Sequence, residues 1–280
     1  MKIATTRPAA LLSRQMTAEA AFVCLLDHCA QQFVAELPHL MLFDDAEGSH
    51  RTRVALRRLR SVLDGFRPIL KRAAIDGVKA EAKGLFRLIG LLRDAEIACE
   101  LAKTAGTDGD AKTLEAMRGT IRSALMALDA PGFAKRTHKW LTGKTWHRAG
   151  HSARDWRKGP VKALAAVALV EAWRTCTAYG PDLAALAPDT RHSFRKDLKT
   201  LRYLGDFFIP LWQTRSTKAF VSTMKALQEE LGILTDVAVL RTLTSPDQDV
   251  ERELDFKVVA ALTKADHLWR KLAGQPVWWR

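Results

Sequence analysis

Apolar residues recur at helical spacing along almost the whole chain, and no stretch of useful length alternates as a strand would. Short polar segments such as "FDDAEGS" and "SPDQD", together with Pro38 and other prolines, separate the periodic segments. Ser49 is a candidate N-cap for one helix, and Asp189 or Thr190 for another. The pattern therefore predicts an all-α protein. The predicted helices cover residues 16–36, 49–67, 72–104, 110–128, 160–179, 190–209, 216–244 and 249–272.

The chain also contains an internal repeat. The segment "HRTRVALRRLR", which starts at His50, reappears 142 residues later as "HSFRKDLKTLR", which starts at His192. In both copies a glycine follows the histidine by 40 residues and an aspartate follows it by 44. The matched pairs are Gly90 with Gly232 and Asp94 with Asp236. We infer a single domain over about residues 15–272, made of two duplicated four-helix units (about 15–128 and 158–272) that a basic segment over 129–157 connects.

Charge narrows the class of partner. The 44 Lys and Arg residues exceed the 31 acidic residues, so the formal net charge is +13. Such an excess is typical of proteins that bind polyanions: nucleic acid, anionic membranes or phosphate polymers. The four cysteines lack C-x-x-C spacing, which favours a reducing compartment, and no apolar run is long enough for a bilayer. We therefore expect a cytoplasmic protein that does not bind membranes.

Helical geometry divides the first copy of the repeat into two faces. At about 100° per residue, His50, Arg53, Arg57 and Arg60 fall within one arc of roughly 80°. The apolar positions of the same helix form a separate stripe, and two further arginines, Arg51 and Arg58, lie outside the basic arc. The apolar positions are Leu56, Leu59, Val62, Leu63 and Phe66.

The second copy has the same division. Its basic arc holds His192, Arg195, Lys199 and Arg202, and its core side holds Phe194, Leu198, Leu201 and Phe208. Lys199 replaces an arginine, which keeps the charge but loses bidentate geometry. A binder of repeated phosphates tolerates that change better than a reader of base edges does. Lys196 and Tyr203 are expected to widen the polar face of this copy.

These segments closely resemble the two signature segments of CHAD domains, the conserved histidine α-helical domains. The resemblance rests on "HRTRVALRRLR" with "GLLRD" and on "HSFRKDLKTLRY" with "LQEELGILTD". It implies two four-helix bundles around a pseudo-twofold axis, with a basic central groove or pore that binds inorganic polyphosphate. The second "GILTD" departs from the pattern, because Thr235 stands where the first copy has Arg93.

The resemblance also supplies the candidate site. Its basic positions fall on the two sets already described: His50, Arg53, Arg57, Arg60, His192, Arg195, Lys199 and Arg202. We add Arg58, Lys83, Lys196 and Lys225 as possible secondary ligands, and Asp94 and Asp236 as carboxylates that orient arginines. Phosphate contact and local hydrogen bonding both stay open for the two histidines. Asp94 and Asp236 are also compatible with simple N-caps or surface residues, and solvated surface positions are favoured for Lys83 and Lys225.

Two other functions stay open. Residues 135–162 hold nine Lys or Arg and one acidic residue, interleaved with Trp140, Trp146 and Trp156. This segment is compatible with a stacking platform for RNA or single-stranded DNA, or with tryptophans packed inside the protein. His147 and His151 have the spacing of helical metal ligands, but no glutamate or third ligand accompanies them.

An enzyme that cleaves phosphoanhydrides is the third possibility. No Walker-type glycine loop, nucleophile elbow, H-E-x-x-H or E-x-E-x-K pattern is present. We therefore expect a non-catalytic binding module without cofactor or metal, with inorganic polyphosphate as its partner and association with polyphosphate granules as its role.

Overall fold

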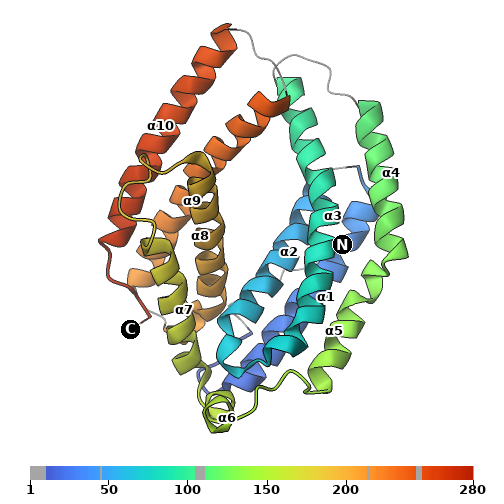
Figure 1. The fold of residues 1–280 in the computed structure, drawn as a ribbon, viewed down its shortest axis with the longest axis vertical. Coiled ribbons are helices and arrows are strands. Elements are labelled where there is room, and N and C mark those ends of the chain that lie inside the picture. Colours follow the sequence, from blue (N-terminus) through green and yellow to red (C-terminus); the bar gives the residue numbers. More distant parts are fainter. Residues whose placement is uncertain (1–10, 45, 105–110, 213–214, 244–247, 280) are drawn as a thin grey trace. The chain divides into compact units, whose positions relative to one another are not determined.

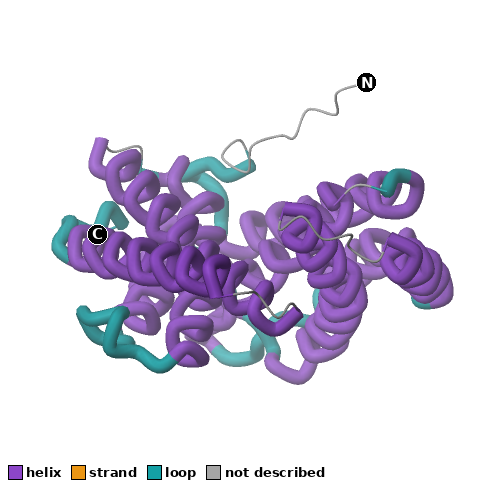
Figure 2. The backbone as a smooth tube through the Cα atoms, turned by 90° about the horizontal axis from the view of Figure 1, so that it is seen from above, coloured by secondary structure: helices purple, strands orange, loops and turns teal. Residues whose placement is uncertain are grey.

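The computed structural model describes residues 11–44, 46–104, 111–212, 215–243 and 248–279. Within these ranges the chain forms helices joined by loops, and its extended pairings are limited to two isolated bridges (Figures 1 and 2). The prediction of an all-α protein is confirmed. The helices are α1 (Ala18–Leu42), α2 (Ala46–Gly65), α3 (Arg72–Thr104), α4 (Ala111–Ala127), α5 (Phe133–Thr142), α6 (His151–Lys158), α7 (Val161–Thr177), α8 (Pro188–Phe208), α9 (Arg215–Leu243) and α10 (Gln248–Ala273), with the short 3₁₀ helices η2 (Arg67–Ile69), η3 (Ala130–Gly132) and η4 (Ile209–Leu211).

Each predicted helix has a counterpart, but several ends differ. Pro38 lies inside α1 and does not end it. α2 begins at Ala46, so Ser49 is not its N-cap. Gly48 lies in this first turn. A Cβ at this position would lie 2.6 Å from the backbone nitrogen of Leu40, so only glycine fits where α2 approaches α1. The glycine is therefore a packing residue and not a loop signal.

The N-cap expected for α8 is also wrong. This helix begins at Pro188 after an Ala187 cap, and Asp189 lies in its first turn. Proline suits the first helical position, since its missing N–H would have no intrahelical partner there. His50 and His192 are each the fifth residue of their helix, counted from Ala46 and from Pro188.

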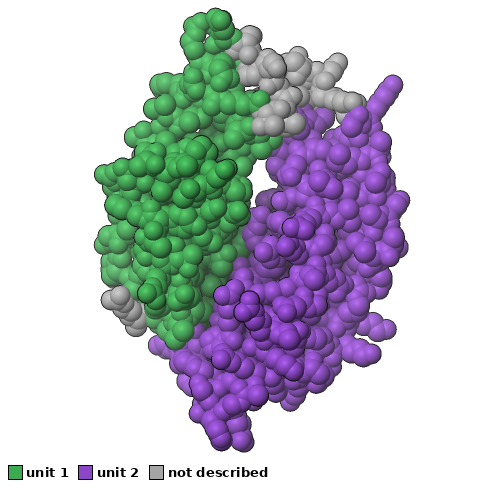
Figure 3. Space-filling model, in the orientation of Figure 1, with its two compact units in different colours: residues 1–13, 165–280 green, residues 14–164 purple. Residues whose placement is uncertain are grey.

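The chain divides into two compact units, which Figure 3 colours separately. Unit 2 is Arg14–Leu164, and unit 1 is Ala165–Arg280 with Met1–Ser13. The segment expected to connect two units contains α5 and α6, and both pack against α1 within unit 2. The basic segment over 129–157 is thus part of one folded unit. The duplication inferred from the sequence remains a prediction.

The core of each unit comes from helix faces with apolar side chains. In unit 2, α2 packs between α1 and α3, and α3 also packs against α4. In unit 1, α9 packs against α8 and α10. An aromatic cluster adds α7 to this core: the ring of Trp173 lies 5.5 Å from that of Phe220 on α9 and 5.6 Å from that of Trp269 on α10.

Candidate functional site

The apolar stripe of α2 fixes which side of the helix its cations occupy. Leu56, Leu59, Val62, Leu63 and Phe66 are fully buried against the neighbouring helices, as the sequence pattern predicts. Burying a large aliphatic or aromatic side chain contributes about 1.5 to 3 kcal/mol, so this stripe holds the rotational position of α2 firmly. The basic positions of α2 are therefore placed by the core and not by their own contacts.

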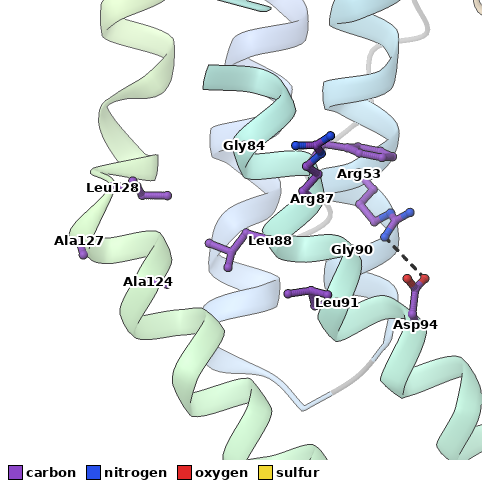
Figure 4. A pocket seen from close by; sticks show the side chains of 11 residues that line it. Arg53, Gly84, Arg87, Leu88, Gly90, Leu91, Asp94, Ala124, Ala127 and Leu128 are labelled. Carbon is purple, nitrogen blue, oxygen red and sulfur yellow. Dashed lines mark ion pairs between the residues drawn. The ribbon is translucent and has the colours of Figure 1, made fainter. Parts of the chain in front are cut away.

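Arg53 is held against one face of α3. Its guanidinium carbon lies 4.5 Å from the centre of the Phe86 ring, and its Nη1 atom lies 3.8 Å from Oδ1 of Asp94. Gly90 lies between these two residues on α3, and a Cβ at Gly90 would come within 2.6 Å of Nη1 of Arg53. Phe86, Gly90 and Asp94 follow one another at four-residue spacing, which aligns them along one helix face. The three form what we call the Arg53 cradle (Figure 4).

Burial changes the chemistry of this arginine. The Arg53 side chain is only 18% exposed, whereas the Asp94 side chain is 73% exposed. Loss of solvent lowers the pKa of Arg53; Asp94 opposes that shift, and the cations Arg57 and Arg93 add to it. An arginine nevertheless stays charged in proteins. The cradle therefore supplies a fixed, partly desolvated cation.

The other basic residues of α2 differ in how firmly they are held. The guanidinium carbon of Arg57 lies 5.2 Å from the centre of the same Phe86 ring, so one aromatic side chain supports two arginines. Arg60 and His50 are exposed. Phe86 thus supports two of the four predicted positions, and the other two are exposed.

Arg51 and Arg58, which the helical wheel places outside the basic arc, lie toward α1. Arg51 forms ion pairs with Glu47, at 2.7 Å, and with Glu36 of α1, at 3.8 Å. The charge of Arg58 lowers the pKa of His28 on α1, in the same direction as the larger effect of burial. Arg58 is therefore removed from the face that carries Arg53 and Arg57, which weakens the case for it as a secondary ligand.

The matched face in unit 1 belongs to α8. The core positions Phe194, Leu198, Leu201 and Phe208 are buried, as predicted. Of the basic positions, His192 and Lys196 are exposed, and Arg195, Lys199 and Arg202 are partly buried.

Tyr203 does not widen the polar face, because it is buried and the guanidinium carbon of Arg202 lies 4.9 Å from the centre of its ring. The tyrosine thus supports a cation from below, a role that apolar patterning alone does not predict.

A small pocket of about 200 Å³ opens beside this face, between α8 and α9. His192 and Arg195 line it from α8, and Thr235 lines it from α9. A Cβ at Gly232 would lie 3.5 Å from Nη2 of Arg195, an ordinary contact distance. The repeated glycine therefore faces the repeated arginine in both units, but the fit is closer in unit 2.

His192 titrates in a strongly positive setting. Partial burial lowers its pKa, and the cations Lys196, Arg195 and Lys199 lower it further, while Asp189 acts in the opposite direction. The imidazole is therefore neutral at pH 7 and becomes a cation more readily when an anion lies beside it.

The remaining candidates divide between surface and structural positions. Lys83 is exposed on α3. Lys225 on α9 is exposed and forms an ion pair with Glu229 at 3.8 Å. Asp236 is exposed on α9 and has further interactions. All three side chains are exposed, and Lys225 and Asp236 also have partners within the protein.

The two residues that break the repeat pattern, Arg93 and Thr235, have different contacts. Arg93 donates to the carbonyl oxygen of Ala46 at 3.3 Å, whereas Thr235 donates to the carbonyl oxygen of Leu231 in its own helix. Arg93 thus connects α3 to the start of α2, whereas this hydrogen bond of Thr235 stays within α9.

Sequence reasoning missed a buried ionic cluster behind the α2 face. Glu96 on α3 is only 5% exposed and accepts a hydrogen bond from the Ser49 hydroxyl. Its carboxylate also lies 3.7 Å from Arg118 of α4 and 3.9 Å from Arg93. This cluster joins α2, α3 and α4 at the end of α2 that carries His50. The single signal for it was a serine placed among helix formers.

The tryptophans of the basic segment are largely internal. Trp146 is fully buried, and its ring lies 4.6 Å from that of Phe22 on α1. Trp140 donates to the carbonyl oxygen of Ala74 at 3.1 Å and packs 6.3 Å from the same phenylalanine ring. Only Trp156 of the three is neither buried nor hydrogen-bonded in this way. This arrangement disfavours a stacking platform made of all three rings.

His147 and His151 do not share a helix. α6 begins at His151, and His147 precedes it, where its Nε2 lies 3.2 Å from Oε1 of Glu19. Among the described residues, no group of three or more His, Cys, Asp or Glu side chains is placed to hold a metal ion. None of the described helices is long and apolar enough to span a membrane.

An apolar pocket adjoins the Arg53 cradle, and Arg53 and the cradle residues Phe86, Gly90 and Asp94 are part of its lining. It has a volume of about 850 Å³, and Leu88 and Leu91 of α3 and Leu128 contribute to its walls. Figure 4 shows Leu88 and Leu91 leaving α3 toward α4, away from the Arg53–Asp94 ion pair. Arg53 of the α2 face and these apolar side chains thus line the same pocket.

Comparisons with known proteins agree with the resemblance of the sequence. The chain matches the CHAD domain family over residues 24–245. It is similar to the crystal structure of the CHAD domain from the plant Ricinus communis, with 20% sequence identity, a TM-score of 0.70 and coverage of 96% of each chain. No curated protein matches. The CHAD family is associated in general with polyphosphate binding. Since the family match spans more than half of its residues, this chain belongs to the CHAD domain family.

Proposed function

We propose that this protein binds inorganic polyphosphate, without cleaving it, through the basic faces of α2 and α8. The ligands are His50, Arg53, Arg57 and Arg60 in unit 2, and His192, Arg195, Lys199 and Arg202 in unit 1. The observation that carries the proposal is the Arg53 cradle. A partly buried arginine held by an aromatic ring, a glycine and a carboxylate is more than a solvated surface cation.

The chemistry of the ligand explains the composition of these faces. Polyphosphate offers repeated anionic oxygens and no bases or rings to read, so closely spaced guanidinium and ammonium donors suffice for recognition. Side chains three and four residues apart on a helix present such donors in a row. The cationic repulsion that this row creates in the free protein is relieved in part by Asp94, which pairs with Arg53.

Matched double variants test the proposal. Arg53→Ala with Arg57→Ala is expected to weaken the binding of long-chain polyphosphate by about 1.5 to 3 kcal/mol for each charged hydrogen bond lost. Arg51→Ala with Arg58→Ala removes the same charge from the α1 side of the helix and is expected to matter less. Binding is measured by titrating labelled polyphosphate at several salt concentrations, with melting temperatures as the check on folding. A larger loss in the Arg51 and Arg58 variant would overturn the proposal.

Competition with RNA separates this function from nucleic-acid binding. Electrostatic binding of either polymer weakens steeply with salt, so the ratio of the two affinities at one salt concentration is the informative quantity. We expect polyphosphate to bind more tightly than single-stranded RNA of equal charge. RNA binding that is equal or tighter would favour the nucleic-acid alternative.

The non-catalytic part of the proposal and the role in the cell have their own tests. Incubation of the protein with polyphosphate and Mg²⁺ is expected to release no orthophosphate; release above a no-protein control would indicate an enzyme. A fluorescent fusion is expected to collect on polyphosphate granules, and the Arg53→Ala, Arg57→Ala fusion to stay diffuse. Diffuse fluorescence of both fusions would refute the recruitment to granules.

A further inference from the structure

Unit 2 also contains a basic pocket that the proposed function does not use. Its volume is about 630 Å³, within the range of small-ligand sites. It lies where η2, the start of α3 and the loop after α5 meet. Five cations line it: Arg67, Lys71, Arg72, Lys79 and Arg148.

Backbone pairing brings these cations together from distant parts of the chain. Leu70 and His147 form an isolated antiparallel bridge, in which Lys71 donates to the carbonyl oxygen of Trp146 at 2.7 Å and Arg148 donates to that of Ile69 at 3.0 Å. The fully buried Trp146 anchors this pairing in the core of unit 2. The position of Arg148 beside Lys71 is therefore set by main-chain hydrogen bonds and by a buried indole.

Carboxylates neutralise only part of the charge. Asp64 lies 2.8 Å from Nζ of Lys79 and 3.1 Å from Nη2 of Arg67, so it occupies two of the five cations. The other three, Lys71, Arg72 and Arg148, are exposed and have no ion-pair partner within the described part of the chain. One further carboxylate, Asp76, lines the pocket. Five cations thus face two carboxylates, which leaves an excess of positive charge in a partly enclosed space.

This pocket is not part of the repeated motif. The shift of 142 residues takes Arg67, Lys71, Arg72 and Lys79 to positions that carry no charge. Those positions are Ile209, Gln213, Thr214 and Val221. The basic excess of the segment over residues 135–162 also has no assigned role on the α2 face, and Arg148 belongs to that segment. The pocket therefore represents a feature of unit 2 alone.

We propose that this pocket binds a compact anion that carries two or three linked phosphate groups, at a site independent of the α2 face. Guanidinium groups pair with phosphate oxygens in two-pronged geometry, and Lys71 adds a point charge beside them. A ligand with several negative charges on adjacent phosphates matches an excess of three cations better than a single carboxylate does. The chemistry fits an inorganic triphosphate and the triphosphate group of a nucleotide equally, and the test separates these sources.

The test titrates tripolyphosphate, and ATP in parallel, into the full chain by calorimetry at 0.15 M salt, on the order of physiological ionic strength. The background is the Arg53→Ala, Arg57→Ala variant, which removes the main cations of the α2 face. Adding Lys71→Ala with Arg148→Ala is expected to lower the affinity at least roughly tenfold, since each charged hydrogen bond contributes about one factor of ten or more. Tighter binding of ATP than of tripolyphosphate would identify a nucleotide as the source, and the reverse an inorganic chain.

The control variant is Lys135→Ala with Arg154→Ala, which removes two exposed cations of α5 and α6 and so the same net charge. It is expected to bind tripolyphosphate as the background does. Lysine footprinting provides a second readout: tripolyphosphate should protect Lys71 from an amine-reactive reagent at concentrations that leave Lys135 reactive. Equal losses in the two variants, no binding by the background, or equal protection of the two lysines would overturn the proposal. If the affinity for long-chain polyphosphate did not depend on Arg53, the proposed function would be refuted, and the result for this pocket would not be affected.

Discussion

Replacement of Gly90 by alanine separates the orientation of Arg53 from its charge. The new Cβ would lie 2.6 Å from Nη1 of Arg53, a distance that real Cβ atoms do not tolerate. The atom in the way is the end of a flexible side chain, so Arg53 moves and the helices stay. The variant keeps every charge of the protein and displaces one guanidinium from its cradle.

The structure sets the size of the two effects. Alanine in the middle of a helix is favoured over glycine by about 1 kcal/mol. Against this stand the loss of the Arg53–Asp94 pair, with Asp94 mostly exposed and hence worth less than about 1 kcal/mol, and of a cation–π contact worth about 0.5 to 1 kcal/mol. The free energy of unfolding should therefore change by less than about 1 kcal/mol.

Binding should change more than stability. If Arg53 makes one charged hydrogen bond to phosphate, its loss costs about 1.5 to 3 kcal/mol, or roughly a 10- to 150-fold loss of affinity. Titration of labelled long-chain polyphosphate measures the affinity, and urea unfolding measures the stability.

Two other glycines provide controls. Gly84→Ala, also on α3, places a Cβ with no heavy atom within 4 Å, and Gly232→Ala places one 3.5 Å from Arg195. Both should stabilise their helices by about 1 kcal/mol and leave affinity close to that of the wild type. Unchanged affinity in Gly90→Ala, or an equal loss in Gly84→Ala, would refute the view that the cradle orients Arg53 for binding.

Further predictions concern single groups. Asp94→Asn should lower polyphosphate affinity, because Arg53 loses its orienting carboxylate, and should leave the melting temperature nearly unchanged; an equal or higher affinity in titration would contradict the orienting role. Polyphosphate affinity should rise as pH falls from 8 to 5, because the lowered pKa of His192 leaves it neutral in the free protein and a bound polyanion favours its protonated form; His192→Gln should flatten this pH profile, and an identical profile would remove the histidine from the site. Glu96→Gln should cost about 3 kcal/mol of unfolding free energy in urea denaturation, since it leaves partly buried arginines without their carboxylate, and a loss below about 1 kcal/mol would show that the cluster is not structural. Burial raises the pKa of Cys29 to about 12, so this thiol should resist a thiol reagent at pH 8 until the protein is unfolded; rapid labelling of the native protein at this cysteine would contradict the buried position.

The helices were predictable because two features of the sequence indicate them: the helical spacing of the apolar residues and the short polar segments that separate the helices. The errors lie at positions that long-range packing decides. Gly48 and Pro38 look like breaks in a linear sequence, yet both lie inside helices. Position 48 is a glycine because α2 passes close to the backbone of α1 there. A distance between two helices leaves no trace in the local pattern of either.

The candidate site was predictable in part for a similar reason. A repeat and a helical wheel suffice to group Arg53 with Arg57 and to exclude Arg51, because these statements concern one helix. The role of Phe86 depends on how α2 and α3 pack, and a phenylalanine in a periodic segment indicates only core. The opposite error affected Tyr203, where a hydroxyl suggested the surface and packing against α8's neighbours placed the ring inside.

The Arg53 cradle also bears on when conformational freedom is lost. A free arginine side chain gives up about 2 kcal/mol of rotamer entropy when it is fixed. In this protein much of that freedom is already gone before any ligand arrives, because Phe86, Gly90 and Asp94 confine the guanidinium during folding. The entropic cost of ordering this donor thus arises during folding. An anion that binds meets a guanidinium group that is already in position.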